Sequence, residues 1–146
     1  MKVYLRTFGC RANHYDSERV RAMVEASGGT IVETPDDADS AVFNSCAVTA
    51  NAEADLRQGV RRAARGRPAL RSVVMGCAAA LAGRTPVGPG TALSALPSVR
   101  AVVAGADLEA VAVALGLSPA ARTGHARSTI WRRRRARWRR IIRRSC

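Results

Sequence analysis

Residues 3–23 read VYLRTFGCRANHYDSERVRAM, and this stretch decides the fold class. It begins with β-branched and aromatic residues, which predict a strand over residues 3–8. A helix is predicted over residues 14–27, because apolar residues recur there at helical spacing: Val20, Met23 and Val24. We expect Asn13 to cap this helix, with Asp16 in the capping-box position. A strand, a glycine-cysteine turn and a helix form the first unit of an α/β fold.

The same alternation continues along the chain. Short apolar runs predict four more strands, over residues 30–33, 41–44, 72–75 and 99–103. Further helices are expected over residues 49–64 with Thr49 as cap, from about residue 78 to Gly83, and over residues 107–115. The pattern predicts one α/β domain over residues 1–117, with an open, mainly parallel, doubly wound sheet of about five strands and helices on both faces.

The net charge of +13 is unevenly distributed. Residues 1–120 hold 13 of the 24 basic residues and all 11 acidic ones, whereas residues 121–146 hold 11 basic residues and no acidic one. We expect residues 118–146 to be a linker and a disordered arginine-rich tail, since like charges repel. The abrupt change favours an out-of-frame or truncated product. The alternative is a nucleic-acid-binding module in which Trp131 and Trp138 stack on bases, and nonspecific RNA binding is expected in either case.

Neither a leader nor a membrane span is apparent in the sequence. The N-terminal residues MKVYLRTFGC lack the apolar run of a signal peptide, and the apolar region near residues 102–117 is interrupted by Asp107 and Glu109. A cytoplasmic protein without membrane contact is therefore expected, and its oligomeric state stays open. In the cytoplasm, the four cysteines are expected to be ligands or reactive thiols and not disulfides.

Three cysteines follow three of the predicted strands. Cys10, Cys46 and Cys77 are separated by 36 and 31 residues, which is too far for a local metal-binding loop. In a parallel sheet, however, the carboxyl ends of all strands lie along one edge, where open α/β sheets bind ligands. Each cysteine also precedes a predicted helix, whose N-terminus favours the thiolate. Gly9 and Gly76 leave room there for a close backbone approach.

Three thiolates without a fourth ligand suit a [4Fe–4S] cluster that keeps one iron open. A zinc-stabilised binding domain is the main inorganic alternative, and simple packing of small buried residues is the other. Cys146, at the end of the arginine-rich tail, has no comparable context and is taken as incidental. His14 and His125 are not assigned to the site.

At these cysteines the sequence resembles a known family. The blocks TFGCRANHYDSE, FNSCAVTANAEADLRQ and VVMGCAA are similar to three signature blocks of the N-terminal domain of radical-SAM methylthiotransferases, and the resemblance covers about residues 1–115. That family inserts sulfur and a methyl group into a tRNA base or a ribosomal-protein side chain. The resemblance implies that Cys10, Cys46 and Cys77 bind an auxiliary [4Fe–4S] cluster whose open iron holds the transferred sulfur. Val48 and Thr49 make the second block most similar to the branch acting on threonylcarbamoyladenosine near the tRNA anticodon.

The sequence departs from the family after the third block. Family members continue into a radical domain, whose CxxxCxxC triad binds a second [4Fe–4S] cluster and S-adenosylmethionine, and then into an RNA-binding domain. No such triad follows here, because Cys146 is the only cysteine after Cys77. The chain is therefore expected to be a fragment of such an enzyme, inactive alone, with no assigned catalytic residue. Whether another chain supplies the radical domain stays open.

Overall fold

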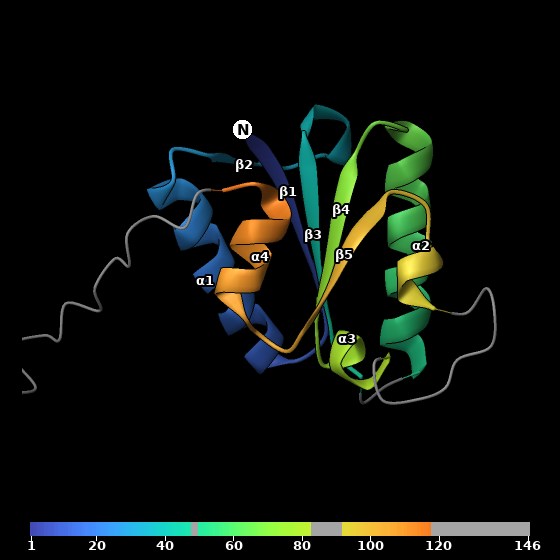
Figure 1. The fold of residues 1–146 in the computed structure, drawn as a ribbon. Helices are drawn as coiled ribbons and strands as arrows, with labels where there is room; N and C mark the ends of the chain where they lie inside the picture. The colour runs from blue at the N-terminus through green and yellow to red at the C-terminus, as the bar shows by residue number, and fades with distance from the viewer. Residues whose placement is uncertain (48–49, 83–91, 118–146) are drawn as a thin grey trace, which may run out of the picture.

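A five-stranded parallel sheet forms the centre of the protein (Figure 1). The computed structural model describes residues 1–47, 50–82 and 92–117. In spatial order, the strands are β2 (Thr30–Val32), β1 (Lys2–Phe8), β3 (Ser40–Ser45), β4 (Arg71–Gly76) and β5 (Val99–Ala104). Every pair of neighbouring strands is parallel, which confirms the predicted fold class.

The strand order reverses direction beside β1. The chain moves outward from β1 to β2, returns to the other side of β1 as β3, and then continues outward through β4 and β5. The register brings Phe8 opposite Ser45 and Asn44 opposite Met75, so the central three strands end at nearly the same level. Such a reversal opens a crevice beyond the carboxyl ends of the strands, which is the usual ligand site of this fold.

Helices cover both faces of the sheet (Figure 1). One face carries α1 (Arg11–Ala26) and α4 (Leu108–Leu115), and the other carries α2 (Ala50–Gly66), α3 (Cys77–Ala82) and the short 3₁₀ helix η2 (Leu93–Ala95). A second 3₁₀ turn, η1 (Pro35–Asp37), precedes β3. Nowhere in residues 1–47, 50–82 and 92–117 is a helix long and apolar enough to cross a membrane.

Strand alternation separates the two halves of the core. Val42 packs in the cluster shared with α1 and α4, whereas its neighbour Phe43 packs in the cluster shared with α2 and α3. β3 is buried along its whole length, as expected for the middle strand of a doubly covered sheet. At its carboxyl end, Asn44 continues on the α1 side and Ser45 on the α2 side, which places polar side chains under the sheet edge.

The start of α1 differs from the sequence prediction. The helix begins at Arg11, three residues before the predicted start, and its N-cap is Cys10. The assignment of Asn13 as N-cap and Asp16 as capping-box partner was wrong, because Asn13 is the third residue of the helix and forms the capping box with Cys10. The predicted Thr49 cap and the predicted helix end at Gly83 lie outside the described residues. The turn η2 was not predicted, since three residues carry no periodic signal.

Candidate cysteine site at the sheet edge

The three cysteines lie directly after three adjacent strands. Cys10 caps α1 after β1, Cys46 follows β3, and Cys77 is the first residue of α3 after β4. The crevice opened by the strand reversal lies between the ends of β1 and β3, so Cys10 and Cys46 flank it. None of the three forms a disulfide; Cys10 and Cys77 are exposed and Cys46 is buried.

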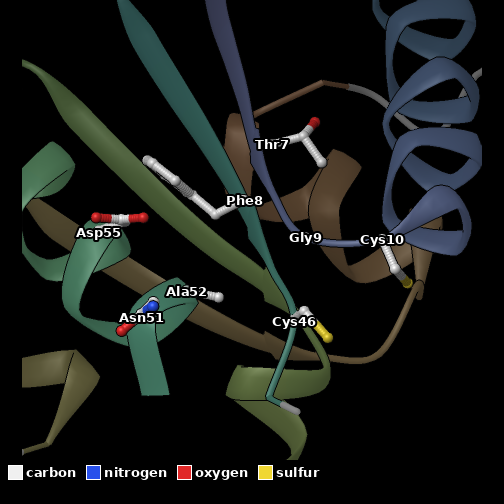
Figure 2. A pocket seen from close by; sticks show the side chains of 8 residues that line it. All are labelled: Thr7, Phe8, Gly9, Cys10, Cys46, Asn51, Ala52 and Asp55. Carbon is white, nitrogen blue, oxygen red and sulfur yellow. The ribbon is translucent and has the colours of Figure 1, made fainter. Parts of the chain in front are cut away.

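Cys10 and Cys46 share a pocket of about 620 Å³ (Figure 2). The thiol of Cys46 points toward the Cys10 side of this pocket. The pocket is lined by Thr7, Phe8, Gly9, Cys10, Cys46, Asn51, Ala52 and Asp55. Cys77 is not among these residues, and within the described ranges no three His, Cys, Asp or Glu side chains form a group that could hold a metal ion. The structure therefore joins two of the predicted ligands in one pocket and places the third after the neighbouring strand.

The helix N-terminus stabilises the thiolate of Cys10. The Cys10 side chain accepts from the backbone N–H of Asn13, while the Asn13 side chain accepts from the backbone N–H of Cys10, which is a capping box built with cysteine. The N–H of Asn13, followed by that of Ala12, lowers the pKa of Cys10 below its usual value, and Cys46 adds a smaller lowering. A thiolate is the form of cysteine that binds metals and attacks electrophiles.

This environment predicts that Cys10 alkylates at lower pH in the folded chain than in the unfolded chain. The thiolate is the reacting species, so the rate with iodoacetamide rises as the thiol ionises, and a lowered pKa moves that rise to lower pH. Peptide mass spectrometry after timed quenching would follow Cys10 separately in buffer and in concentrated urea. Identical pH midpoints in the two states would contradict the assigned environment.

Two glycines allow the turns before the cysteines to pack closely. A Cβ added at Gly9, whose φ is +155°, would lie 2.6 Å from Asn13 Oδ1 and 2.7 Å from Cys46 Cβ. A Cβ at Gly76, whose φ is +99°, would overlap Asn44 Oδ1 and lie 2.6 Å from the Ser45 carbonyl oxygen. Side chains rarely approach this closely, so both positions require glycine.

Gly76→Ala is therefore expected to destabilise the fold markedly. The positive φ alone costs about 1–3 kcal/mol for a residue with a side chain, and the overlap with Asn44 adds to it. Gly105→Ala is the matched control, because Gly105 has a φ of +65° and its added Cβ would meet no atom within 4 Å. Urea unfolding of both variants measures the difference, and equal losses of stability would contradict the close approach at Gly76.

The structure also places the remaining residues that the sequence singled out. His14 is exposed in the first turn of α1, and Asp16, two residues later, is half-buried. His125 and Cys146 lie outside the described residues, as do Val48 and Thr49. Sequence reasoning did not find Asn44 or the pocket residues Asn51 and Asp55, since no motif or spacing marks them.

The donor set fits a thiolate-bound metal. Cys10, Cys46 and Cys77 follow strands at one edge of the sheet, none of the three forms a disulfide, and the lowered pKa of Cys10 favours its thiolate. Sulfur ligands of this kind hold iron–sulfur clusters or zinc, whereas magnesium and calcium prefer oxygen.

Comparison with known proteins identifies relatives of this arrangement. Residues 2–88 match the uncharacterized protein family UPF0004. The threonylcarbamoyladenosine tRNA methylthiotransferase MtaB of Rickettsia prowazekii (strain Madrid E) is 45% identical over 73 residues, which cover 50% of this chain and 15% of that protein. The tRNA-2-methylthio-N(6)-dimethylallyladenosine synthase of Thermodesulfovibrio yellowstonii (strain ATCC 51303 / DSM 11347 / YP87) is 37% identical over 84 residues, covering 56% of this chain and 20% of that protein.

A third relative matches the same share of this chain as the second. The tRNA-2-methylthio-N(6)-dimethylallyladenosine synthase of Burkholderia ambifaria (strain MC40-6) is 39% identical over 87 residues, covering 56% of this chain and 19% of that protein. The chain thus spans 15% to 20% of the length of these relatives. The match over residues 2–88 includes all three cysteine-bearing turns. The chain therefore belongs to the UPF0004 family, which is the N-terminal domain of proteins that include the tRNA methylthiotransferases named above.

Proposed function

We propose that residues 1–117 are the cluster-binding, sulfur-donor domain of a tRNA methylthiotransferase, with Cys10, Cys46 and Cys77 as the ligands of an auxiliary [4Fe–4S] cluster. The observation that carries this proposal is the position of three cysteines, none of them in a disulfide, directly after three adjacent parallel strands. Each strand end delivers one thiol, so the three ligands come from a rigid sheet and not from one flexible loop.

The residues of the chain have separate tasks in this proposal. The Asn13 and Ala12 N–H groups lower the pKa of Cys10 and so favour its thiolate. Cys46 lies buried beside the pocket, where its backbone N–H donates to the Phe8 carbonyl at 2.8 Å and fixes it to the end of β1. Three protein thiolates would leave one iron of a bound cluster open, and that position would supply the sulfur to be transferred.

The substrate proposed for the intact enzyme is a modified adenosine near the tRNA anticodon. The 45% identical relative is a threonylcarbamoyladenosine tRNA methylthiotransferase, which together with Val48 and Thr49 favours that base over dimethylallyladenosine. S-adenosylmethionine and a second [4Fe–4S] cluster would be bound by a radical domain with a CxxxCxxC triad. Because these 146 residues contain no such triad, we also propose that they do not cleave S-adenosylmethionine unaided. A cytoplasmic location follows from tRNA as substrate.

Anaerobic reconstitution with ferrous iron and sulfide tests the proposed function. The chain should gain a brown colour with broad visible absorption and about four irons and four sulfides. Parallel loading with zinc distinguishes the alternative, since a zinc domain would stay colourless and bind about one zinc per chain. A chain that binds zinc tightly and retains no iron after desalting would overturn the cluster assignment.

A further inference from the structure

Two buried asparagines form a pair directly beneath the cysteine turns. Asn13 on α1 and Asn44 on β3 are 2% and 0% exposed, although they are 31 residues apart in the chain. The Asn13 Nδ2 donates to Asn44 Oδ1 at 3.0 Å, and the Asn44 Nδ2 donates to the Asn13 carbonyl oxygen at 2.8 Å. Such a reciprocal pair fixes the first turn of α1 against the carboxyl end of β3.

The hydrogen bonds determine which way each amide faces. The main-chain carbonyl oxygen of Asn13 can only accept, so the Asn44 Nδ2 must lie toward it. The Asn44 Oδ1 then lies toward the side-chain amide of Asn13. The Asn13 Nδ2 therefore faces Asn44, and its Oδ1 faces Cys10. Asn44 Nδ2 also donates to Ser17 Oγ at 3.1 Å, and Ser17 Oγ lies 2.7 Å from Thr7 Oγ1, which extends the network to β1.

The network contacts two of the cysteine turns and lies next to the third in the chain. Asn13 Oδ1 lies 3.4 Å from both the backbone nitrogen and the Sγ of Cys10. Asn44 lies in β3, two residues before Cys46, which follows that strand. The Cα of Gly76, immediately before Cys77, approaches Asn44 Oδ1 so closely that no side chain fits between them. The asparagine pair therefore contacts the turns that follow β1 and β4. Asn44 itself belongs to β3, the strand that precedes Cys46.

We infer that Asn13 and Asn44 are positioning residues that hold the Cys10, Cys46 and Cys77 turns in register for a shared ligand. The inference rests on the proposed function for the identity of that ligand, but not for the placement of the thiols. Two amides are suited to this task because each supplies donors and an acceptor, so one pair can link a helix, two strands and a turn in a site that excludes water. Apolar residues of the same size would fill the space without fixing the orientation of the turns.

A probe that needs no cluster tests the placement of the thiols. Phenylarsine oxide bridges two thiols only when they are close, and Cys77→Ser with Cys146→Ser leaves Cys10 and Cys46 as its targets. In that background, Asn13→Ala and Asn44→Ala should weaken arsenical binding about 10–100-fold, the range for residues that orient ligands. Ser72→Ala is the matched control, because Ser72 is fully buried and contacts Ser98 Oγ at 2.8 Å at the opposite end of β4.

A second probe uses the reconstituted full chain. Loss of iron to a ferrous chelator should become about 10–100-fold faster in Asn13→Ala and Asn44→Ala and should not change in Ser72→Ala. Asn13→Asp retains an acceptor for the Cys10 N–H but loses the Nδ2 donor to Asn44, so it is a second variant beside the alanine ones, and circular dichroism checks that each of them folds. Its added negative charge beside Cys10 should lower the reduction potential of the bound cluster, a change that loss of stability alone would not produce.

The outcomes separate this inference from the proposed function. If the parent chain binds no iron but arsenical binding falls in both asparagine variants, the cluster assignment fails and the positioning role stands. If folded Asn13→Ala and Asn44→Ala chains bind the arsenical as tightly as the parent chain, the positioning role is overturned. Equal losses in Ser72→Ala would also overturn it, because they would show a general effect of lost stability. A reduction potential unchanged in Asn13→Asp would contradict the placement of Asn13 beside Cys10.

Discussion

Replacing Cys10, Cys46 or Cys77 singly with alanine is expected to remove most of the iron from the reconstituted chain. Each thiolate comes from a different strand end, so no neighbouring cysteine can substitute for the one that is lost. Iron content should fall from about four per chain to well below half of that, with loss of the visible absorption. Colorimetric iron and sulfide assays after anaerobic desalting measure the effect.

Cys146→Ala is the matched control for this series. It removes a thiol outside the described residues and outside the family match over residues 2–88, so iron content should stay at the parent value. Retention of all the iron by any one of the three strand-end variants would remove that residue from the ligand set. Cys77 is the most informative of the three, because its side chain does not line the pocket shared by Cys10 and Cys46.

Phe43→Ala should produce the largest loss of stability in the domain. Phe43 is fully buried in the middle strand, where its ring meets Tyr4 edge-on at 6.1 Å and stacks with Phe8 at 6.5 Å. Removing a buried phenylalanine leaves a cavity and costs about 3–5 kcal/mol, which is a large part of the total stability of a domain this size. Equilibrium unfolding in urea, followed by circular dichroism, measures the change.

Val113→Ala is the control for Phe43→Ala. Val113 lies on α4 with 64% of its surface exposed, so its truncation should change the free energy of unfolding by less than about 0.5 kcal/mol. A Phe43→Ala variant as stable as the Val113→Ala variant would contradict the description of the core beneath α2 and α3.

The sheet was predictable because its signals are local. Short apolar runs such as residues 41–44 mark buried strands, and the helices between them carry apolar stripes at helical spacing. The alternation of strands and helices along the chain then predicts a parallel sheet with helices on both faces. Element ends were less predictable: β3 runs one residue beyond its predicted span at each end, and α2 extends to Gly66.

The details beneath the site could not be predicted in the same way. Cysteine is an uncommon helix cap, so the residue pattern pointed to Asn13, which is a common one. The actual role of Asn13 depends on Asn44, which lies 31 residues later and has no periodic relation to it. A polar pair between a helix and a distant strand is specified by the tertiary fold, and no local sequence pattern marks it.

The parallel pairing of the central strands also determines when, during folding, the sheet edge that carries Cys10, Cys46 and Cys77 can form. Val3 pairs with Ser40, and Ser40 with Arg71, so both contacts close long segments of chain and no hairpin can form in advance. Long-range parallel pairing slows folding, because the entropy of loop closure is lost before the contacts compensate for it. During synthesis, the edge can assemble only after β4 has emerged. Iron offered to the growing chain before that point would meet separate thiols on an unfolded segment, so loading of the proposed cluster is expected to follow the folding of the sheet.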